Sequence, residues 1–258
     1  MHHACKDDSR GGRRVKLKKL RDKLLDLVFP PLCASCDEPT GNHDALCDEC
    51  LAKYAKEQKI KCRTCHMPAS DCSCSIGNGV HGLICSTFYT HYEAGGDRVT
   101  EKLIFRLKRE RDDKLCDFFA REASAKVMRH LHMMKLDINR CVITYTPRSE
   151  SGIRKYGFDH ARLVAAGISH YTGIPLAVTL DRAGGDEQKK LTGSERLRNV
   201  QTSLRIYDKA DVRGLTVFLF DDIVTTGATV GTASSLLKEA GASSVIPVPI
   251  ARTENRGR

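Results

Sequence analysis

The sequence predicts an α/β protein in which a small cysteine-rich module precedes a parallel sheet with helices on both faces. Residues 80–258 alternate apolar, strand-like runs with amphipathic segments, which is the pattern of a parallel α/β sheet. The run 215–220 is apolar on both faces, as a central parallel strand requires. Eight of the twelve cysteines lie within residues 24–78. We therefore expect a basic tail over 1–23, a cysteine module over 24–78 and the α/β domain over 79–258.

The elements of the α/β domain follow from its hydrophobic pattern. This pattern predicts strands near 83–90, 141–146, 215–220 and 244–250, and helices near 97–109, 115–134, 159–172 and 229–240. Gly241 follows the last helix and supplies the left-handed residue that commonly ends a helix. The stretch 182–199 is polar, basic and glycine-rich, so we expect a loop there.

The composition indicates in which cellular compartment we expect the protein. The 258 residues contain no run that approaches the roughly 20 apolar residues of a membrane-spanning helix. The amino terminus has no hydrophobic signal core, so we expect a cytoplasmic protein without membrane insertion. Because the cytosol keeps thiols reduced, the twelve cysteines are not expected to form disulfides.

The chain is basic, with a formal net charge of +10. Residues 1–32 hold nine Lys and Arg against four Asp, and further basic clusters lie in 102–114 and 189–205. Such charge attracts polyanions, either nucleic acid or polyphosphate. For the first 22 residues a solvated basic tail is an equal alternative.

Four closely spaced cysteine pairs indicate bound metal. The pairs are Cys33/Cys36, Cys47/Cys50, Cys62/Cys65 and Cys72/Cys74. Two thiolates close in sequence can hold one tetrahedral Zn²⁺ from a tight turn, and two such pairs complete a closed structural site. We therefore expect two structural zinc ions. Sequential pairing and cross-brace pairing both remain open, and the short gaps between neighbouring pairs favour sequential pairing.

An acidic pair and a threonine-glycine turn follow the strand predicted at 215–220. The order is Asp221 and Asp222, then a turn that enters a helix. Ligands of open α/β sheets bind at the carboxyl ends of strands. The backbone amides of this turn and its hydroxyl groups can hold a phosphate dianion at the helix amino terminus. The residues that we expect around the phosphate are Thr225, Thr226, Gly227, Ala228 and Thr229.

The two carboxylates suit the sugar half of the same ligand. We expect Asp221 and Asp222 to face solvent or ligand and to make no core contact. They can accept hydrogen bonds from two vicinal ribose hydroxyls or hold Mg²⁺ through water. A ribose 5-phosphate therefore satisfies the acids and the turn together, whereas the alternative is an ordinary acid-capped helix. The turn does not match a Walker loop.

The run 220–229 resembles the phosphoribosyl pyrophosphate (PRPP) motif of type I phosphoribosyltransferases. Further segments resemble the competence protein ComF family: 24–33, 103–108, 154–161 and 191–200. The resemblance implies a type I phosphoribosyltransferase fold behind a double zinc ribbon, with PRPP and Mg²⁺ as ligands. In the third segment Asp159 and His160 replace the family's usual Asn-Gln.

The loop after the strand at 141–146 departs from the family pattern. The family usually has a histidine before its arginines, and this chain keeps only Pro147 and then has Arg148. The resemblance implies that this loop holds pyrophosphate. The backbone amides and Arg148 can still do so, whereas the loop lacks the histidine that could transfer a proton.

Two basic segments are candidates for ligand closure or nucleic-acid binding. The loop 182–199 carries Lys189, Lys190, Arg196 and Arg198, which suits a mobile basic hood over pyrophosphate. The alternative for this loop is a solvated basic surface. Arg154, Lys155 and Tyr156 combine basic and aromatic groups, which suits base stacking on a single strand. The alternative is that Phe158 is core and Tyr156 is incidental.

Two function classes remain open. One is an enzyme, a glycosyltransferase that binds Mg·PRPP, expels pyrophosphate and joins the ribose C1′ to an unknown nucleophile. The other is a binding module that senses PRPP while its basic surface binds single-stranded DNA or a DNA-uptake helicase. The resemblance implies a link to DNA uptake in natural transformation for either class.

Overall fold

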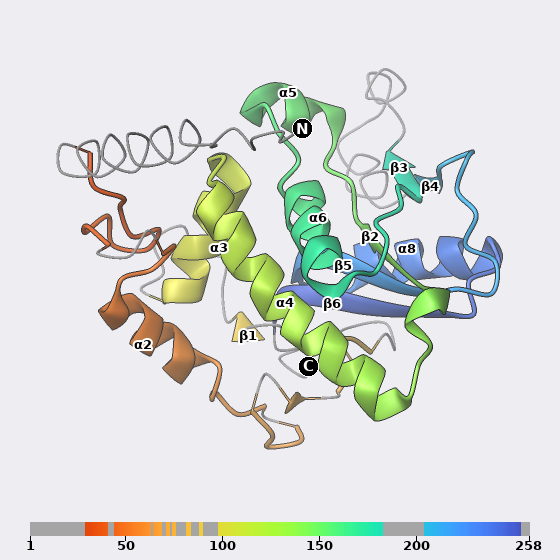
Figure 1. The fold of residues 1–258 in the computed structure, drawn as a ribbon, viewed down its shortest axis with the longest axis horizontal. Coiled ribbons are helices and arrows are strands. Elements are labelled where there is room, and N and C mark those ends of the chain that lie inside the picture. Colours follow the sequence, from red (N-terminus) through yellow and green to blue (C-terminus); the bar gives the residue numbers. More distant parts are fainter. Residues whose placement is uncertain are drawn as a thin grey trace, which may run out of the picture.

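The computed structural model has a four-stranded parallel sheet at its centre (Figure 1). The strand order is β1-β6-β5-β2, and a separate antiparallel pair joins β3 to β4. The predicted α/β class with a parallel sheet is thereby confirmed. The structure describes residues 29–40, 44–62, 64–68, 71–72, 74–75, 81–83, 88–89, 98–182 and 204–253.

β5 is the central strand of this sheet. It pairs with β2 from Cys141↔Thr216 onwards and with β6 from Thr216↔Ser244 onwards. Both partners are parallel to it, so its apolar side chains are buried on both faces. The strands are β1 (Phe88–Tyr89), β2 (Cys141–Tyr145), β3 (Leu180–Arg182), β4 (Leu204–Ile206), β5 (Thr216–Val224) and β6 (Ser244–Thr253).

Helices cover both faces of the sheet. They are α2 (Asp48–Glu57), α3 (Val99–Arg109), α4 (Asp113–Met134), α5 (Glu150–Tyr156), α6 (His160–Thr172) and α8 (Ala228–Glu239), with a short 3-10 helix η2 (Ile138–Arg140). The predicted helices correspond to α3, α4, α6 and α8 within two residues at each end. In the described ranges, no helix combines the length and the apolar character that a membrane crossing needs.

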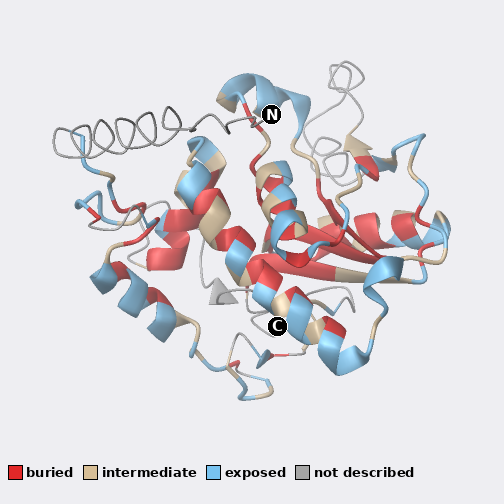
Figure 2. Cartoon of the chain, in the orientation of Figure 1, coloured by how far each residue is buried: buried red, intermediate tan, exposed pale blue. Residues whose placement is uncertain are grey.

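The two sheet faces contact different helices. Phe218 and Phe220 of β5 pack against α4 and α6, which lie together on one face. Val217 and Leu219 pack against residues of α8. This helix lies on the opposite face of the sheet (Figures 1 and 2). This alternation follows from the period of two in a strand. Gly241, with φ 97°, ends α8 in the left-handed conformation that its position predicted.

The cysteine module contributes to both cores. Cys33, Cys50 and Tyr54 join the core that contains α3, α4 and α6. Cys62 and Cys72 join the core that contains α8. Each half of the module is therefore attached to a different face of the same sheet.

Some elements differ from the prediction. β5 continues through both acidic residues to Val224, whereas the sequence pattern ended the strand at 220. The helices α2 and α5 were not predicted, because both are short and strongly charged. Of the basic loop 182–199, Arg182 is described as the last residue of β3. The tail 1–23 and the hood candidates Lys189, Lys190, Arg196 and Arg198 lie outside the described residues. The bounds of the three predicted regions stay a prediction.

Candidate phosphate-binding site and zinc centres

The turn from β5 into α8 is built around Gly227. This glycine has φ 77° and ψ 2°, a left-handed conformation that side chains disfavour. It is also the N-cap residue of α8, so no side chain caps the first turn from that position. The free amides at a helix amino terminus attract anions. The sequence therefore places a helix end that can attract an anion directly after the acidic strand.

The other residues of the turn complete a small cup. Thr225 and Thr226 are exposed, and Thr226 Oγ1 accepts a hydrogen bond from the Ala228 amide at 3.4 Å. A cavity of about 30 Å³ is lined by Asp221 and by residues 223–230. This volume suits about two water-sized groups, so the cup can hold the phosphate end of a ligand but not a whole sugar phosphate.

Asp221 is the acid on the side of the cup. Its Oδ1 accepts hydrogen bonds from Thr146 Oγ1 at 2.8 Å and from the Asp222 amide at 2.9 Å. Thr146 directly follows β2, so the ends of two neighbouring strands meet here. Burial raises the pKa of Asp221 to about 7, with the charge of Asp222 as the second cause.

Asp222 occupies a different environment. It is 8% exposed, and its Oδ2 lies 2.8 Å from His160 Nε2 and 3.1 Å from Lys108 Nζ. Its Oδ1 accepts a hydrogen bond from the Ile223 amide at 2.6 Å. Burial alone would raise the pKa of Asp222, but the His160 hydrogen bond and the Lys108 charge outweigh burial and hold the pKa below its ordinary range.

The expectation that both acids face solvent or ligand is therefore wrong for Asp222. Consecutive strand residues point to opposite faces, and β5 continues past both acids. Asp221 points to the face of the cup, and Asp222 points to the face that α4 and α6 cover, where it meets His160 and Lys108. The two adjacent acids were visible in the sequence. Their side chains point to opposite faces because β5 extends beyond residue 220 and includes both of them.

Lys108 and His160 are site residues that the sequence prediction missed. Lys108 lies in the last turn of α3, and His160 is the first residue of α6. Asp159 caps α6 through hydrogen bonds from the Ala161 and Arg162 amides. His160 Nδ1 is buried and makes no hydrogen bond within the described residues. The available signals were the basic end of the helix at 103–108 and the histidine in place of the family's glutamine.

The first half of the cysteine module positions α3. The Glu57 carboxylate, at the end of α2, accepts hydrogen bonds from the Val99 and Thr100 amides at 2.7 and 3.0 Å. Arg106 Nη1 lies 2.7 Å from Asp37 Oδ1, next to Cys36. A carboxylate at a helix amino terminus and a salt bridge near its end fix the helix at both ends. This arrangement places Lys108 beside Asp222.

Arg148 holds the loop after β2 against the helices. Its guanidinium donates to the backbone oxygens of Lys108 at 2.5 Å and of Phe158 at 3.3 Å, and it lies 4.2 Å from the Tyr156 ring centroid. Its amide donates to Asp159 Oδ2 at 3.0 Å. The side chain is thus engaged within the protein, and binding of pyrophosphate by Pro147 and Arg148 stays a prediction.

Arg182 is a second cation that the sequence prediction missed. Its Nε donates to the Pro147 carbonyl at 2.7 Å. Burial lowers the pKa of Arg182, and the nearby charges of Asp221, Asp159 and Asp222 oppose that lowering. The acidic pair therefore contacts Lys108 directly and interacts electrostatically with Arg182.

The nucleic-acid candidates on α5 lie on the surface. Arg154 and Lys155 are exposed, and Lys155 Nζ lies 5.1 Å from the Tyr156 ring centroid. Phe158 is 8% exposed and belongs to the interior, as the alternative interpretation held. A role of Arg154, Lys155 and Tyr156 in nucleic-acid binding stays a prediction.

The eight paired cysteines form two clusters. One contains Cys33, Cys36, Cys47 and Cys50, and the other contains Cys62, Cys65, Cys72 and Cys74, with all sulfurs of a cluster within 4.8 Å of one another. The sequential pairing is thereby confirmed. The Sγ–Sγ distances include 3.7 Å for Cys36–Cys47 and 3.5 Å for Cys65–Cys72. Tetrahedral Zn²⁺ with bonds of about 2.3 Å needs sulfurs about 3.8 Å apart, so both clusters fit zinc.

The two clusters repeat one local structure. The amides of Cys33 and Cys62 donate to the carbonyls of Glu38 and Met67, each at 2.8 Å. Asp37 and His66 take the same place in the two turns, with φ 59° and 58°. Such tight turns let two thiolates converge on one ion. Both clusters are closed sets of four sulfurs, which is typical of structural zinc.

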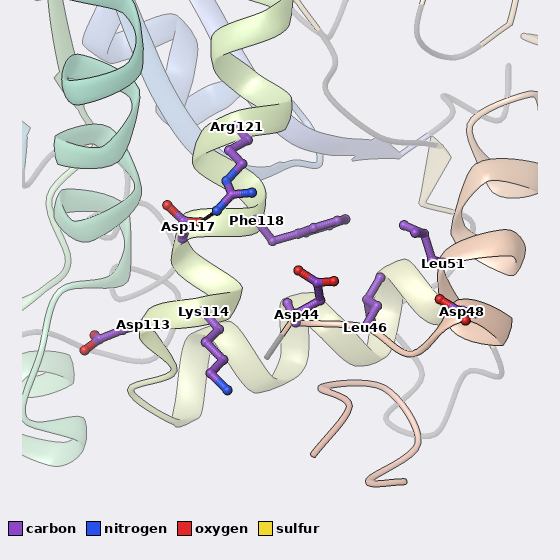
Figure 3. Close-up of a pocket in the computed structure, with 10 residues that line it drawn as sticks. Asp44, Leu46, Asp48, Leu51, Asp113, Lys114, Asp117, Phe118 and Arg121 are labelled. Atoms are coloured by element: carbon purple, nitrogen blue, oxygen red, sulfur yellow. Dashed lines mark ion pairs between the residues drawn. The ribbon is translucent and has the colours of Figure 1, made fainter. Parts of the chain in front are cut away.

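A larger cavity lies apart from the phosphate turn. It has a volume of about 510 Å³ and lies between the first cysteine cluster's module and α4 (Figure 3). Asp44 and Leu46 contribute from the module, whereas Lys114 and Phe118 contribute from α4. No residue of the turn 225–229 lines it.

Comparison with known proteins matches both regions of the chain. Residues 24–87 match the double zinc ribbon domain, and residues 152–256 match the phosphoribosyl transferase domain. The chain pairs a double zinc ribbon with a phosphoribosyl transferase domain. This is the domain pair that the resemblance to the ComF family predicted, and that prediction is confirmed.

Individual proteins match this chain to different extents. The DNA utilization protein YhgH of Salmonella typhimurium is 26% identical over 229 residues, which cover 85% of this chain and 96% of that protein. An adenine phosphoribosyltransferase of Treponema denticola is 32% identical over 83 residues, which cover 32% of this chain and 43% of that enzyme. The structure of a hypoxanthine phosphoribosyltransferase from Staphylococcus aureus is similar over 57% of this chain and 68% of the transferase chain, with 12% sequence identity and a TM-score of 0.35.

We predict two bound Zn²⁺ per chain. The reason is the two tetrahedral sets of thiolates. Changing Cys36→Ser together with Cys47→Ser should lower the content to one. Metal analysis of the purified protein measures this directly. Cys116→Ala, a buried cysteine outside the clusters, is the control and should retain two. One or no zinc in the unmodified chain would contradict the assignment.

We predict opposite stability effects for the two acids. Asp222→Asn removes the charge that pairs with Lys108 and His160, so it should destabilise the fold by about 1–3 kcal/mol. Asp221→Asn keeps an acceptor for Thr146 and removes an unfavourable charge, so it should leave stability unchanged or raise it. Urea unfolding of both variants at pH 8 measures the difference. Equal effects of the two changes would show that the acids do not occupy distinct environments.

The two acids also make the stability of the fold depend on pH in opposite directions. The raised pKa of Asp221 makes its ionisation unfavourable for folding, so stability should fall as the pH rises from about 4, the unfolded value, to about 7. The lowered pKa of Asp222 supplies stability above about pH 4 that is lost as the pH falls below it. The gain from Asp221→Asn should thus be larger at pH 8 than at pH 5, by on the order of 1 kcal/mol. An equal gain at both pH values would contradict the raised pKa.

Proposed function

We propose that the chain binds PRPP with Mg²⁺ at the carboxyl end of β5. The observation that carries this proposal is an uncapped helix amino terminus, shaped by left-handed Gly227, immediately beyond a strand that bears two acids. In this proposal the turn Thr225, Thr226, Gly227, Ala228 and Thr229 holds the 5-phosphate. The phosphoribosyl transferase domain match supports a ligand of this class.

The two acids have different roles in this proposal. Asp221 accepts hydrogen bonds from the ribose hydroxyls, because it lines the cup beside the turn. Asp222 is held by Lys108 and His160 and keeps these two side chains at the site. The carboxylate oxygens at this strand end are the hard donors that Mg²⁺ prefers, and the ion supplies charge neutralisation to the diphosphate when bound.

Two cations near the acidic pair support loss of pyrophosphate in this proposal. When the bond from C1′ to the diphosphate oxygen breaks, negative charge grows on the leaving group. Lys108 and Arg182 lie near the acidic pair and can stabilise that charge, and they are fixed by contacts to Asp222 and Pro147. The acceptor nucleophile that takes C1′ is a question for experiment. Pyrophosphate release from PRPP with candidate acceptors distinguishes an enzyme from a PRPP sensor.

We also propose that the chain acts on DNA in the cytoplasm. The relative that matches 85% of the chain is named a DNA utilization protein, and this chain carries a net charge of +10. Basic charge with exposed Arg154, Lys155 and the Tyr156 ring suits single-stranded nucleic acid with little sequence preference. Within this proposal the protein supports DNA uptake, with a helicase of that system as partner.

We predict that Gly227→Ala weakens PRPP binding at least tenfold. A side chain in the left-handed region costs about 1–2 kcal/mol, and relief of that strain would displace the amides that face the phosphate. Gly173→Ala is the matched control, because Gly173 has φ 73° and no atom within 4 Å of an added Cβ. Calorimetric titration of Mg·PRPP measures both. Equal affinities of the two variants would remove the turn from the proposed site.

We predict salt-sensitive binding of single-stranded DNA. Release of counterions should lower the affinity about a hundredfold or more between about 50 mM and 200 mM salt. Arg154→Ala with Lys155→Ala should weaken binding and flatten this salt dependence. Lys209→Ala with Lys238→Ala removes the same charge elsewhere on the surface and should weaken binding less. Fluorescence anisotropy with a labelled oligonucleotide is the measurement. Undetectable binding at low salt would refute the DNA proposal.

A further inference from the structure

Arg252 connects the parallel sheet to the second cysteine cluster. It is the ninth residue of β6 and is only 5% exposed. Its Nη2 donates to Cys72 Sγ at 3.0 Å and to Cys62 Sγ at 3.5 Å. Its Nη1 donates to the carbonyls of Cys74 and Ser75 at 3.1 and 2.9 Å. A buried guanidinium is costly unless it is paired, and here these four hydrogen bonds go to the second cluster's module.

The chemistry of the cluster explains a cation at this place. Four thiolates around one Zn²⁺ leave a net charge of −2, which is unfavourable away from water. The guanidinium offsets part of this charge and donates N–H groups to two sulfurs, as second-shell donors do around metal ligands. The arginine near the first cluster makes a different contact. Arg106 reaches the Asp37 carboxylate beside that cluster, and its side chain is 23% exposed.

The neighbours of Arg252 touch the phosphate turn. Arg252 lies opposite Val224 in the β5–β6 register, at the last residue of β5. The next residue, Thr253, donates from Oγ1 to the Thr225 carbonyl at 2.9 Å. One residue of β6 therefore bonds to the zinc ligands and the following residue bonds to the turn. A shift of the strand end on loss of zinc would be transmitted over a single peptide unit.

We propose that Arg252 is a positioning residue that couples occupancy of the second zinc site to the geometry of the phosphate turn. Arg252 retains the zinc by neutralising the thiolates, and the loaded cluster in turn fixes the end of β6 and, through Thr253, the turn at Thr225. The second half of this inference rests on the proposed function, because it uses PRPP as the ligand of the turn. The first half concerns zinc alone.

Zinc release into a chromogenic chelator tests the first half on the full chain. In Arg252→Gln one of the two zinc ions should leave at least tenfold faster than in the unmodified protein, and the other should leave at an unchanged rate. Arg252→Lys keeps the charge but loses the forked geometry, so its rate should be intermediate. Arg106→Gln is the control at the first cluster and should leave the second site's rate unchanged. Unchanged release in Arg252→Gln, or equal acceleration of both ions, would overturn the inference.

A second arm measures the coupling to the turn. Removal of the fast-leaving zinc should weaken Mg·PRPP binding at least fivefold, and readdition of zinc should restore it. Thr253→Val should retain both zinc ions at unmodified rates while PRPP affinity falls and no longer depends on the second zinc. PRPP affinity that is independent of that zinc in the unmodified chain would overturn the coupling. If the unmodified, zinc-loaded chain does not bind PRPP, the proposed function fails, and the zinc-release result still decides the role of Arg252.

Discussion

The buried carboxylate of Asp222 organises the proposed site. A carboxylate that is 8% exposed at the end of a strand needs polar or charged partners, and these come from two helices. His160 requires that α6 begin beside β5, and Lys108 requires that α3 end there. Because Glu57 caps α3, the first zinc ribbon becomes part of this arrangement. The contact between Lys108 and Asp222 therefore links the first half of the module, through α3, to the end of β5.

The two ribbons support the site from different sides. The first acts through α3 and Lys108 on the face that α4 and α6 cover. The second acts through Arg252 and Thr253 on the end of β6, next to the turn. Structural zinc at these positions would hold the walls of a ligand site without contacting the ligand. This explains in physical terms why a zinc module without an open coordination position accompanies the turn that we propose to bind phosphate.

Local patterns in the sequence were sufficient to predict the first part of β5, the glycine turn and α8, and to favour the sequential cysteine pairing over the cross-brace alternative. Each of these depends on residues close in the chain, such as Gly227 between a strand and a helix, or Cys33 and Cys36 in one turn. Lys108 and Arg182 escaped prediction because their proximity to Asp222 and Asp221 depends on contacts between residues far apart in sequence. The placement of the two acids on opposite faces was not predicted, because β5 extends beyond the position where charged residues usually end a strand.

A crystal structure of the zinc-loaded chain with PRPP and Mg²⁺ tests the account most directly. The account predicts the 5-phosphate within hydrogen-bond distance of the amides of residues 226–229 and the ribose hydroxyls against Asp221, with Asp222 still bound to His160 and Lys108. The diphosphate should lie toward Lys108 and Arg182. PRPP bound elsewhere, for example in the 510 Å³ cavity beside α4, or a turn that stays empty at saturating PRPP, would contradict it.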